Sequence, residues 1–273
     1  MASDLIVKPG KKFLLNSVDP DDFGSWKNRK DEGVQQLADF RQELDTLQEI
    51  LFAEQKHKVL VVLQAMDTAG KDGTIRAVFE GVNPQGVQVC NFKAPSTEEL
   101  KHDYLWRIHS RVPQTGELVI FNRSHYEDVL IVRVHNWIDD AECTRRFQQI
   151  NEFERMLVEE GTTILKFFLH ISKEEQKTRL LERIDTPEKQ WKFSTSDLPE
   201  RALWDGYMAA YENMLNATST GLAPWYVIPG NHNWYRNLRV AEIIVETLRG
   251  LNMQYPKPSV DLAPFKQQLL SEK

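Results

Sequence analysis

Residues 59–79, VLVVLQAMDTAGKDGTIRAVF, decide the fold of this chain. The first five of them are apolar and mostly β-branched, which is typical of a buried strand. Small residues follow from 65 to 73, and apolar residues then recur at helical spacing, which indicates a turn and the beginning of a helix. The sequence therefore predicts a strand, a loop and a helix in direct succession.

The loop, residues 65–73, is called the phosphate loop because Gly70 and Lys71 stand where such a loop places its glycine and lysine. Backbone N–H groups and the positive end of the helix then face an anion, and lysine adds a full charge. The match to G-x-x-x-x-G-K-[ST] is incomplete, since Ala65 replaces the first glycine and Asp72 the hydroxyl residue. The alternative is that small residues merely allow tight packing. We expect these residues to bind phosphate: Ala69, Gly70, Lys71, Asp72, Gly73 and Thr74.

A metal ion at this loop needs an oxygen ligand other than the missing hydroxyl. Asp67 lies inside the loop and carries the carboxylate that Mg²⁺ prefers. The predicted strand 117–121 ends at Asn122, where P-loop enzymes place a Walker B aspartate. Asparagine is uncharged, so more of the metal binding falls on Asp67. We predict Mg²⁺ as cofactor, with Asp67 and Asn122 as its protein ligands.

Composition and length place the chain among ordinary globular proteins. Its 273 residues allow one large domain or two modest ones. No segment approaches the roughly 18 apolar residues needed to span a bilayer, and residues 1–20 lack a secretory signal. We expect a cytoplasmic protein with no membrane association. Cys90 and Cys143 form no metal-binding pair, so buried thiols are expected rather than a disulfide or zinc site.

The net charge of -6 argues against nucleic acid as a partner. Basic residues nevertheless gather locally, near Lys8, Arg133, Arg145 and Arg179. Local basic clusters on an acidic protein indicate a confined anionic substrate, although each cluster is equally consistent with a solvated helix face.

Hydrophobic periodicity places further elements along the chain. Ser96 and Glu99 form a capping box, and Ser172 and Glu175 form another. Strands are predicted at 59–63, 87–92, 117–121, 163–169 and 225–228, and helices at 25–55, 96–113, 142–160, from 172, at 204–215 and at 240–251.

Polar residues follow the strand 117–121 directly. In open α/β sheets ligands bind beyond the carboxyl ends of the strands, so these side chains should lie beside the phosphate loop. Arg123 offers a fork of donors to phosphate oxygens, and Glu127 and Asp128 follow a turn later. Lys93, at the end of another strand, is within reach of the same anion, although a solvated lysine is as good an interpretation.

A second basic group lies in the helix from 172 and the segment after it. Arg179 and Arg183 share one helix face, where they would bridge consecutive phosphates or pair with nearby glutamates. Residues 185–201 combine charges, proline and aromatic rings, as expected of a lid that excludes water during phosphoryl transfer. Trp191 and Phe193 would stack on a base, or alternatively pin the lid to the core.

Five segments together resemble a known family: AMDTAGKDGTI, FKAPSTEEL, FNRSHYEDVL, ERIDTPEKQWKFS and APWYVIPGNHNWYR. Over residues 25–250 the chain closely resembles the polyphosphate kinase 2 family. The FNRSHYEDVL form, with Asn122 and Glu127, looks like the subgroup that phosphorylates AMP as well as ADP.

The resemblance implies an α/β fold of the P-loop kinase type, similar to thymidylate kinase, with a five-stranded parallel sheet between helices and a helical lid. It divides the chain into an N-terminal arm (1–24), a kinase-like domain (25–255) with its lid at 185–205, and a C-terminal tail (256–273). It also implies a homodimer or homotetramer.

The resemblance further implies that inorganic polyphosphate donates the phosphoryl group and that Mg²⁺ is required. Asp67 would hold Mg²⁺ and orient the attacking phosphate, and Lys71 would neutralise the transferring group. Arg123 and Arg133 would bind phosphates near the reaction centre. Arg179 and Arg183 would close the far side of the site from the lid helix, and Glu127 would help place a nucleotide or a second metal. From the sequence as a whole, we expect these residues around the nucleotide: Asn122, Glu127, Asp128, Trp191 and Phe193.

We therefore predict a polyphosphate-dependent kinase that converts AMP to ADP and ADP to ATP, reversibly. One alternative is an ATP-dependent nucleoside monophosphate kinase on the same fold. The other is a non-catalytic regulator that binds polyphosphate or nucleotide.

Overall fold

The computed structural model describes residues 4–272 and is built on one parallel sheet. Its strands lie in the order β2-β3-β1-β4-β5, with β1 at the centre. Val61 of β1 pairs with Ile120 of β3 on one side and with Leu165 of β4 on the other. The predicted α/β fold with five parallel strands is confirmed. The strands are β1 (Lys58–Ala65), β2 (Val87–Asn91), β3 (Leu118–Asn122), β4 (Thr162–His170) and β5 (Trp225–Pro229).

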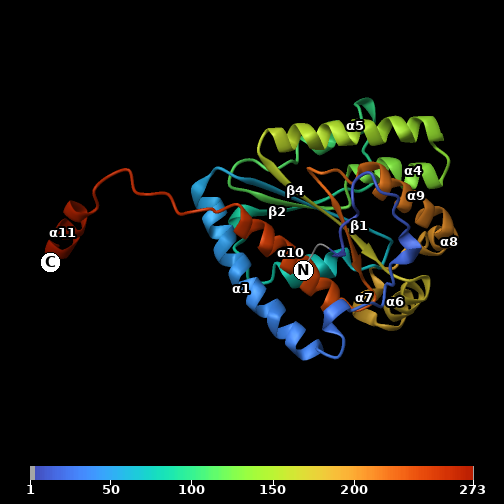
Figure 1. Cartoon of the computed structure of the whole chain (residues 1–273), viewed down its shortest axis with the longest axis horizontal. Coiled ribbons are helices and arrows are strands. Elements are labelled where there is room, and N and C mark those ends of the chain that lie inside the picture. The colour runs from blue at the N-terminus through green and yellow to red at the C-terminus, as the bar shows by residue number, and fades with distance from the viewer. Residues whose placement is uncertain (1–3, 273) are drawn as a thin grey trace.

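Helices cover both faces of the sheet (Figure 1). On one side lie α1 and α10, and on the other α5 and α9. Both faces of the central strands are therefore buried, which explains the continuous apolar run of β1. The longer helices are α1 (Lys30–Glu54), α2 (Lys71–Val78), α5 (Asp140–Glu159), α6 (Lys173–Asp185), α9 (Trp204–Thr218), α10 (Asn233–Gly250) and α11 (Ala263–Ser271), and the shorter ones α3 (Trp106–His109), α4 (Ile131–Val134), α7 (Pro187–Gln190) and α8 (Asp197–Ala202).

The predicted helix at 96–113 is wrong as a continuous element. The capping box forms, because the Ser96 N–H donates to Glu99 and the Glu99 N–H donates to the Ser96 hydroxyl. The chain forms only a short 3-10 turn, Glu99–Lys101, and leaves it at His102. Asp103 then accepts a hydrogen bond from the Leu105 N–H at 2.9 Å, in a turn that precedes α3. A side chain that bonds to nearby backbone in this way competes with a continuing helix.

Helix α10 begins seven residues before the predicted position of 240. Its first turns bury Tyr235, Arg236, Asn237 and Arg239 together. Because polar and apolar residues alike are buried there, these turns show no amphipathic pattern that a sequence could reveal.

Both ends of the described chain lie outside the helical layers. Near the N-terminus, the Val7 N–H donates to the Trp225 carbonyl and the Val227 N–H to the Leu5 carbonyl, so this segment runs antiparallel to β5. At the other end α11 stands away from the body (Figure 1), and all of its residues are exposed.

Two sequence expectations concern thiols and membranes. Cys90 and Cys143 are both free; Cys143 is buried and Cys90 partly exposed. Within residues 4–272, the helices include none with the length and apolarity that crossing a bilayer requires.

Candidate active site

The phosphate loop joins the central strand β1 to the N-terminus of α2. Two of its residues, Thr68 and Gly70, have positive φ angles of 66° and 96°. This curved backbone turns the loop around the helix N-terminus, where N–H groups are available to an anion. The predicted strand, loop and helix are confirmed at the positions given by the sequence.

Lys71 folds back over the loop from the first position of α2. Its ammonium group donates to the Ala65 carbonyl at 2.8 Å and to the Met66 carbonyl at 3.4 Å. Burial, assisted by the nearby charge of Arg123, lowers the pKa of Lys71 to about 8, against the opposing effect of Asp67. The lysine is thus a buried cation close to its titration range at neutral pH.

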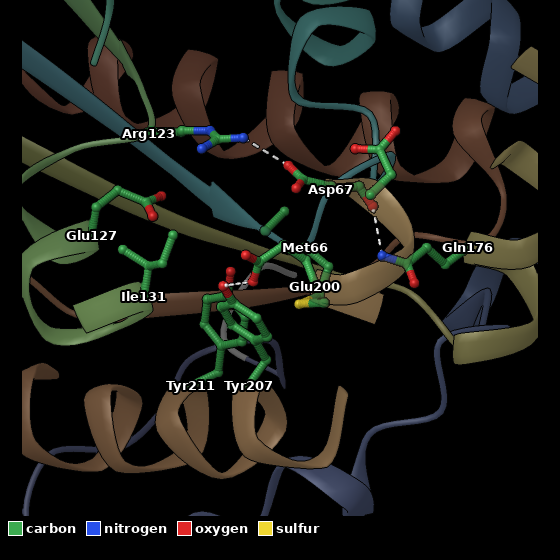
Figure 2. A pocket seen from close by; sticks show the side chains of 11 residues that line it. Met66, Asp67, Arg123, Glu127, Ile131, Gln176, Glu200, Tyr207 and Tyr211 are labelled. Carbon is green, nitrogen blue, oxygen red and sulfur yellow. Dashed lines mark hydrogen bonds and ion pairs between the residues drawn. The ribbon is translucent and has the colours of Figure 1, made fainter. Parts of the chain in front are cut away.

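Arg123 follows β3 and faces the loop from the neighbouring strand. Its guanidinium donates to a carboxylate oxygen of Asp67 at 2.7 Å, as Figure 2 shows. Burial lowers the pKa of Arg123, but the charges of Asp67 and Glu127 outweigh that effect and raise it. Gln176 of α6 fixes the other side of Asp67 by donating to its backbone carbonyl at 3.1 Å.

Asn122, the last residue of β3, does not stand alone in place of the Walker B aspartate. Its amide nitrogen donates to a carboxylate oxygen of Asp72 at 2.6 Å. The carboxylate that the strand lacks is therefore present on the first turn of α2. Compared with the usual pattern, a carboxylate on α2 stands in place of the hydroxyl, and an amide on β3 stands in place of the aspartate.

Three hollows meet at Arg123, which lines each of them. The first, shown in Figure 2, is small and lies between Arg123 and Glu127 on one side and Tyr207 and Tyr211 on the other. The second, the loop groove, has a volume of about 830 Å³ and is lined by Asp67, Lys71, Asp72, Asn122, Arg183 and Trp191.

The third hollow, the side pocket, has a volume of about 740 Å³. Glu127 and Asp128 stand at it together with Arg123, and apolar walls come from Phe92, Tyr104, Ile131, Val132, Trp137 and Ile138. Both volumes lie in the range of small-molecule sites. Because Arg123 borders both hollows, a phosphoryl group at Arg123 is accessible from either one.

The acidic residues of the side pocket are strongly affected by burial. Burial raises the pKa of Glu127, while Arg123 and Lys71 oppose that change. Burial also raises the pKa of Asp128 to about 6, against the charges of Arg107 and Arg146. Carboxyl groups with raised pKa values in a cleft are typical of functional sites.

The predicted lid contributes to the loop groove. Arg183 of α6 lies 3.7 Å from Asp197 and donates to the Lys192 carbonyl at 3.4 Å. Trp191 lines the groove and is 79% exposed, so its ring is available for stacking. Lys93 lines the groove and the side pocket alike. Phe193 is partly buried and is not among the residues that line the groove.

The structure does not bring Arg179 and Arg183 to the same surface of the groove. Arg179 donates to the backbone carbonyls of Thr68, Gly230 and Asn231, at 2.8 to 3.2 Å, and pairs with Glu175. Its donors are therefore committed to holding the loop backbone. The shared helix face, visible in the sequence, gave no sign of these backbone acceptors.

The structure also places Arg133 away from Arg123. Arg133 pairs with Asp140 and donates to Asn136 at 3.2 Å. It lines a separate hollow with Cys143 and Asn213. The short helix α4 explains the difference: Ile131 faces the pocket of Figure 2, and Arg133, two residues later, points elsewhere.

Sequence reasoning assigned no role to three residues that shape the site: Gln176, Tyr211 and Arg236. Arg236 donates to the Ala69 carbonyl at 3.0 Å from beneath the phosphate loop. The segment that contains it, APWYVIPGNHNWYR, was one of the five that carried the resemblance. That polar segment directly after a buried strand was the available signal for Arg236.

Comparisons with known proteins show the family of the chain. The model of the family "Polyphosphate kinase 2 (PPK2)" matches residues 27–256. An AMP/ADP-polyphosphate phosphotransferase of Meiothermus ruber is 60% identical over 92% of this chain and 94% of its own length. An ADP-polyphosphate phosphotransferase of Rhodopseudomonas palustris is 43% identical over 95% of this chain and 98% of its own.

A solved structure extends the similarity to the fold. The crystal structure of polyphosphate kinase 2 from Arthrobacter aurescens TC1 superposes with a TM-score of 0.95 at 46% identity. The superposition covers 99% of this chain and 96% of that one. With its P-loop fold, its phosphate loop and a family match over most of its length, the chain belongs to the polyphosphate kinase 2 family.

Proposed function

We propose that this protein transfers a phosphoryl group from inorganic polyphosphate to AMP and ADP, giving ADP and ATP reversibly. The observation that carries the proposal is the position of Arg123. It contacts Asp67 of the phosphate loop and borders both the loop groove and the side pocket. A donor in one hollow and an acceptor in the other would meet at its guanidinium.

The loop groove suits the polyphosphate donor. Its cations come from separate parts of the chain and include Lys71 from α2, Arg123 after β3, and Arg183 from α6. Polyphosphate is a linear polyanion, so it needs a row of positive charge rather than groups that recognise a base. Phosphoryl transfer spreads negative charge over the equatorial oxygens, and fixed cations stabilise that charge.

The side pocket suits the nucleotide acceptor. Its apolar and aromatic walls can hold a base, while Arg123 stands at its border with the loop groove and Glu127 at its border with the small hollow of Figure 2. This assignment moves the base away from Trp191 and Phe193, where the sequence predicted it. Trp191 instead lines the groove that we assign to polyphosphate.

The oxygen groups of the loop groove fit Mg²⁺. This ion keeps several waters and binds through one or two carboxylates together with substrate phosphates. Asp67 and Asp72 supply two carboxylates at the groove, and Asn122 orients the second one. Within residues 4–272 no group of three or more His, Cys, Asp or Glu residues could hold a metal alone. Mg²⁺, when bound, would neutralise phosphate charge between donor and acceptor.

The chain's own residues would perform the remaining steps. Lys71 and Arg183 bind and align the polyphosphate, Arg123 holds the transferring group, and Asp67 fixes the orientation of Arg123. The segment 185–205 would act as the lid and exclude water.

A donor exchange tests the function. Purified protein is offered AMP, ADP, GMP and GDP, each with polyphosphate and Mg²⁺ or with ATP and Mg²⁺, and products are separated by chromatography. We expect ADP and ATP from the polyphosphate reactions, and also guanine products. If product forms with ATP as the donor but not with polyphosphate, the ATP-dependent kinase is favoured. Binding of polyphosphate without any product would favour the non-catalytic regulator.

A cytoplasmic location and a homodimer or homotetramer stay predictions. Sedimentation equilibrium of the purified chain measures the oligomeric state directly.

A further inference from the structure

Arg236 is a buried guanidinium whose hydrogen-bond partners are all neutral. It is 2% exposed. One terminal nitrogen donates to the Ala69 carbonyl at 3.0 Å and to the Asn233 amide oxygen at 2.7 Å. The other two nitrogens donate to the Asn237 amide oxygen at 3.2 and 3.0 Å. Among the described residues 4–272, no carboxylate forms an ion pair with it.

The guanidinium lies directly against the backbone of the phosphate loop. Gly70 has a φ of +96°, and a Cβ built on it would lie 2.4 Å from the terminal nitrogen of Arg236. Only a glycine leaves room for this contact. A positive charge is thus held against Gly70, in the loop whose backbone N–H groups are available to the expected anion.

The charges around Arg236 do not balance it. Burial and the charge of Arg179 lower the pKa of Arg236 to about 9, and the charge of Glu175 only partly opposes them. Glu175 is itself bound to Arg179 at 2.7 Å. Two cations therefore share one carboxylate beneath the loop. A buried charge without a counter-ion is costly, so a site that keeps one gains an interaction elsewhere.

We propose that Arg236 is a positioning residue of the phosphate loop and that the phosphate oxygens bound across the loop supply its counter-charge. The proposal rests on the proposed function, because it takes polyphosphate as the anion. The segment 230–236, which lies outside the phosphate loop, then contributes to the binding of polyphosphate through the charge of Arg236.

The test compares Arg236→Gln, which removes the charge, with Arg236→Lys, which keeps it. Thermal unfolding of the full chain is followed with and without polyphosphate, and the Kd values for polyphosphate and for AMP are measured by calorimetry. For Arg236→Gln we expect a Tm without polyphosphate equal to or above that of the wild type, because a buried unpaired charge is gone. We also expect a smaller rise in Tm with polyphosphate and a Kd for polyphosphate raised about tenfold, with the Kd for AMP unchanged.

Arg236→Lys should keep most of the polyphosphate affinity. Arg179→Gln is the matched control, because Arg179 also holds the loop backbone but has a carboxylate partner. We expect it to lower the Tm to the same extent with and without polyphosphate.

A purely structural role for Arg236 makes the opposite prediction. Arg236→Gln would then lower the Tm equally in both conditions and leave the Kd for polyphosphate unchanged, which would overturn the proposal. A Kd for polyphosphate raised about tenfold over the wild type in Arg236→Lys, which keeps the charge, would overturn it too, and this comparison with the wild type remains if the glutamine variant does not fold. Failure of the proposed function looks different: the wild-type protein itself would form no product from polyphosphate and AMP.

Discussion

The amide nitrogen of Asn122 donates a hydrogen bond of 2.6 Å to a carboxylate oxygen of Asp72. The two residues come from different elements, the end of β3 and the first turn of α2, and both line the loop groove. One negative charge and one amide therefore share this corner of the site. The pairing explains how an uncharged residue can occupy the usual position of the Walker B aspartate.

Asn122→Asp should disturb this corner by placing two carboxylates at hydrogen-bond distance. Like charges so close raise one of the two pKa values, so the acid limb of the pH–rate profile should move to higher pH. We expect kcat/KM near pH 7 to fall about tenfold, the equivalent of about 1.4 kcal/mol. The exchange variant Asp72→Asn/Asn122→Asp restores one charge and should recover part of the loss. If the exchange is no better than the single variant, the pairing has no role in activity.

Lys71→Ala should lower turnover by on the order of 10² or more, because it removes a cation that stabilises the transition state. Lys177→Ala, which changes an exposed lysine on α6, is the control and should behave like the wild type. The measurement is steady-state ADP formation from AMP and polyphosphate. Turnover within threefold of the wild type would remove Lys71 from the mechanism.

The pKa of Lys71, lowered to about 8, predicts a pH dependence. Below pH 8 the ammonium form dominates in the free enzyme, and above pH 8 the neutral amine does. We therefore expect kcat/KM for polyphosphate to fall as the pH rises through about 8. The basic limb of the kcat profile should lie at higher pH than that of kcat/KM, because the bound polyanion favours the charged form of Lys71. A flat profile between pH 7 and 9 would contradict this prediction.

Glu127→Gln should affect AMP more than ADP. Glu127 lines the side pocket together with Arg123, and we expect the shorter acceptor to depend more on groups placed there. The ratio of kcat/KM for ADP to that for AMP should rise, and Glu152→Gln, on the exposed face of α5, should leave it unchanged. Equal losses for both acceptors would show that Glu127 does not distinguish them.

Removal of divalent cations should abolish turnover and spare the fold. The core is formed by apolar residues of the sheet and helices, whereas Asp67 and Asp72 lie at the groove. With excess EDTA we expect no product and nearly the same Tm, and Mg²⁺ should restore activity. Full activity in EDTA would exclude the proposed metal role.

Glu154→Gln should destabilise the protein by about 3–5 kcal/mol, because it leaves the buried Lys166 without its counter-charge. The Lys166 ammonium donates to Glu154 at 2.6 Å and to Tyr126 at 2.9 Å, and both charged residues are almost fully buried. Urea unfolding gives the free energy. Glu159→Gln, which breaks the exposed pair with Arg155 on the same helix, should cost no more than about 1 kcal/mol.

The sequence predicted the parts of the fold that follow from local pattern. The β-branched run before the loop and the small-residue turn around Gly70 determine β1, the phosphate loop and α2. The residues of each segment favour one low-energy backbone conformation. The prediction of one helix over 96–113 was wrong because the Asp103 side chain accepts a hydrogen bond from the nearby backbone and so interrupts the helix, although the apolar pattern continues.

The site was predictable only where the motif fixed the position of a side chain. Asp67, Lys71 and Arg123 follow strand ends, and the parallel sheet brings those ends together. Arg179 and Arg133 lie on helices, where one turn or a nearby carboxylate decides the direction of a long side chain. The Asn122–Asp72 contact joins residues far apart in sequence, so no local pattern could reveal it.

The position of α11 has a practical consequence. This helix stands clear of the sheet (Figure 1). Its residues are exposed, and none of them lines the loop groove or the side pocket. An affinity tag, a fused second enzyme or a linker to a solid support attached at that end would leave the loop groove open. This end is therefore the natural place for attaching the protein to a solid support.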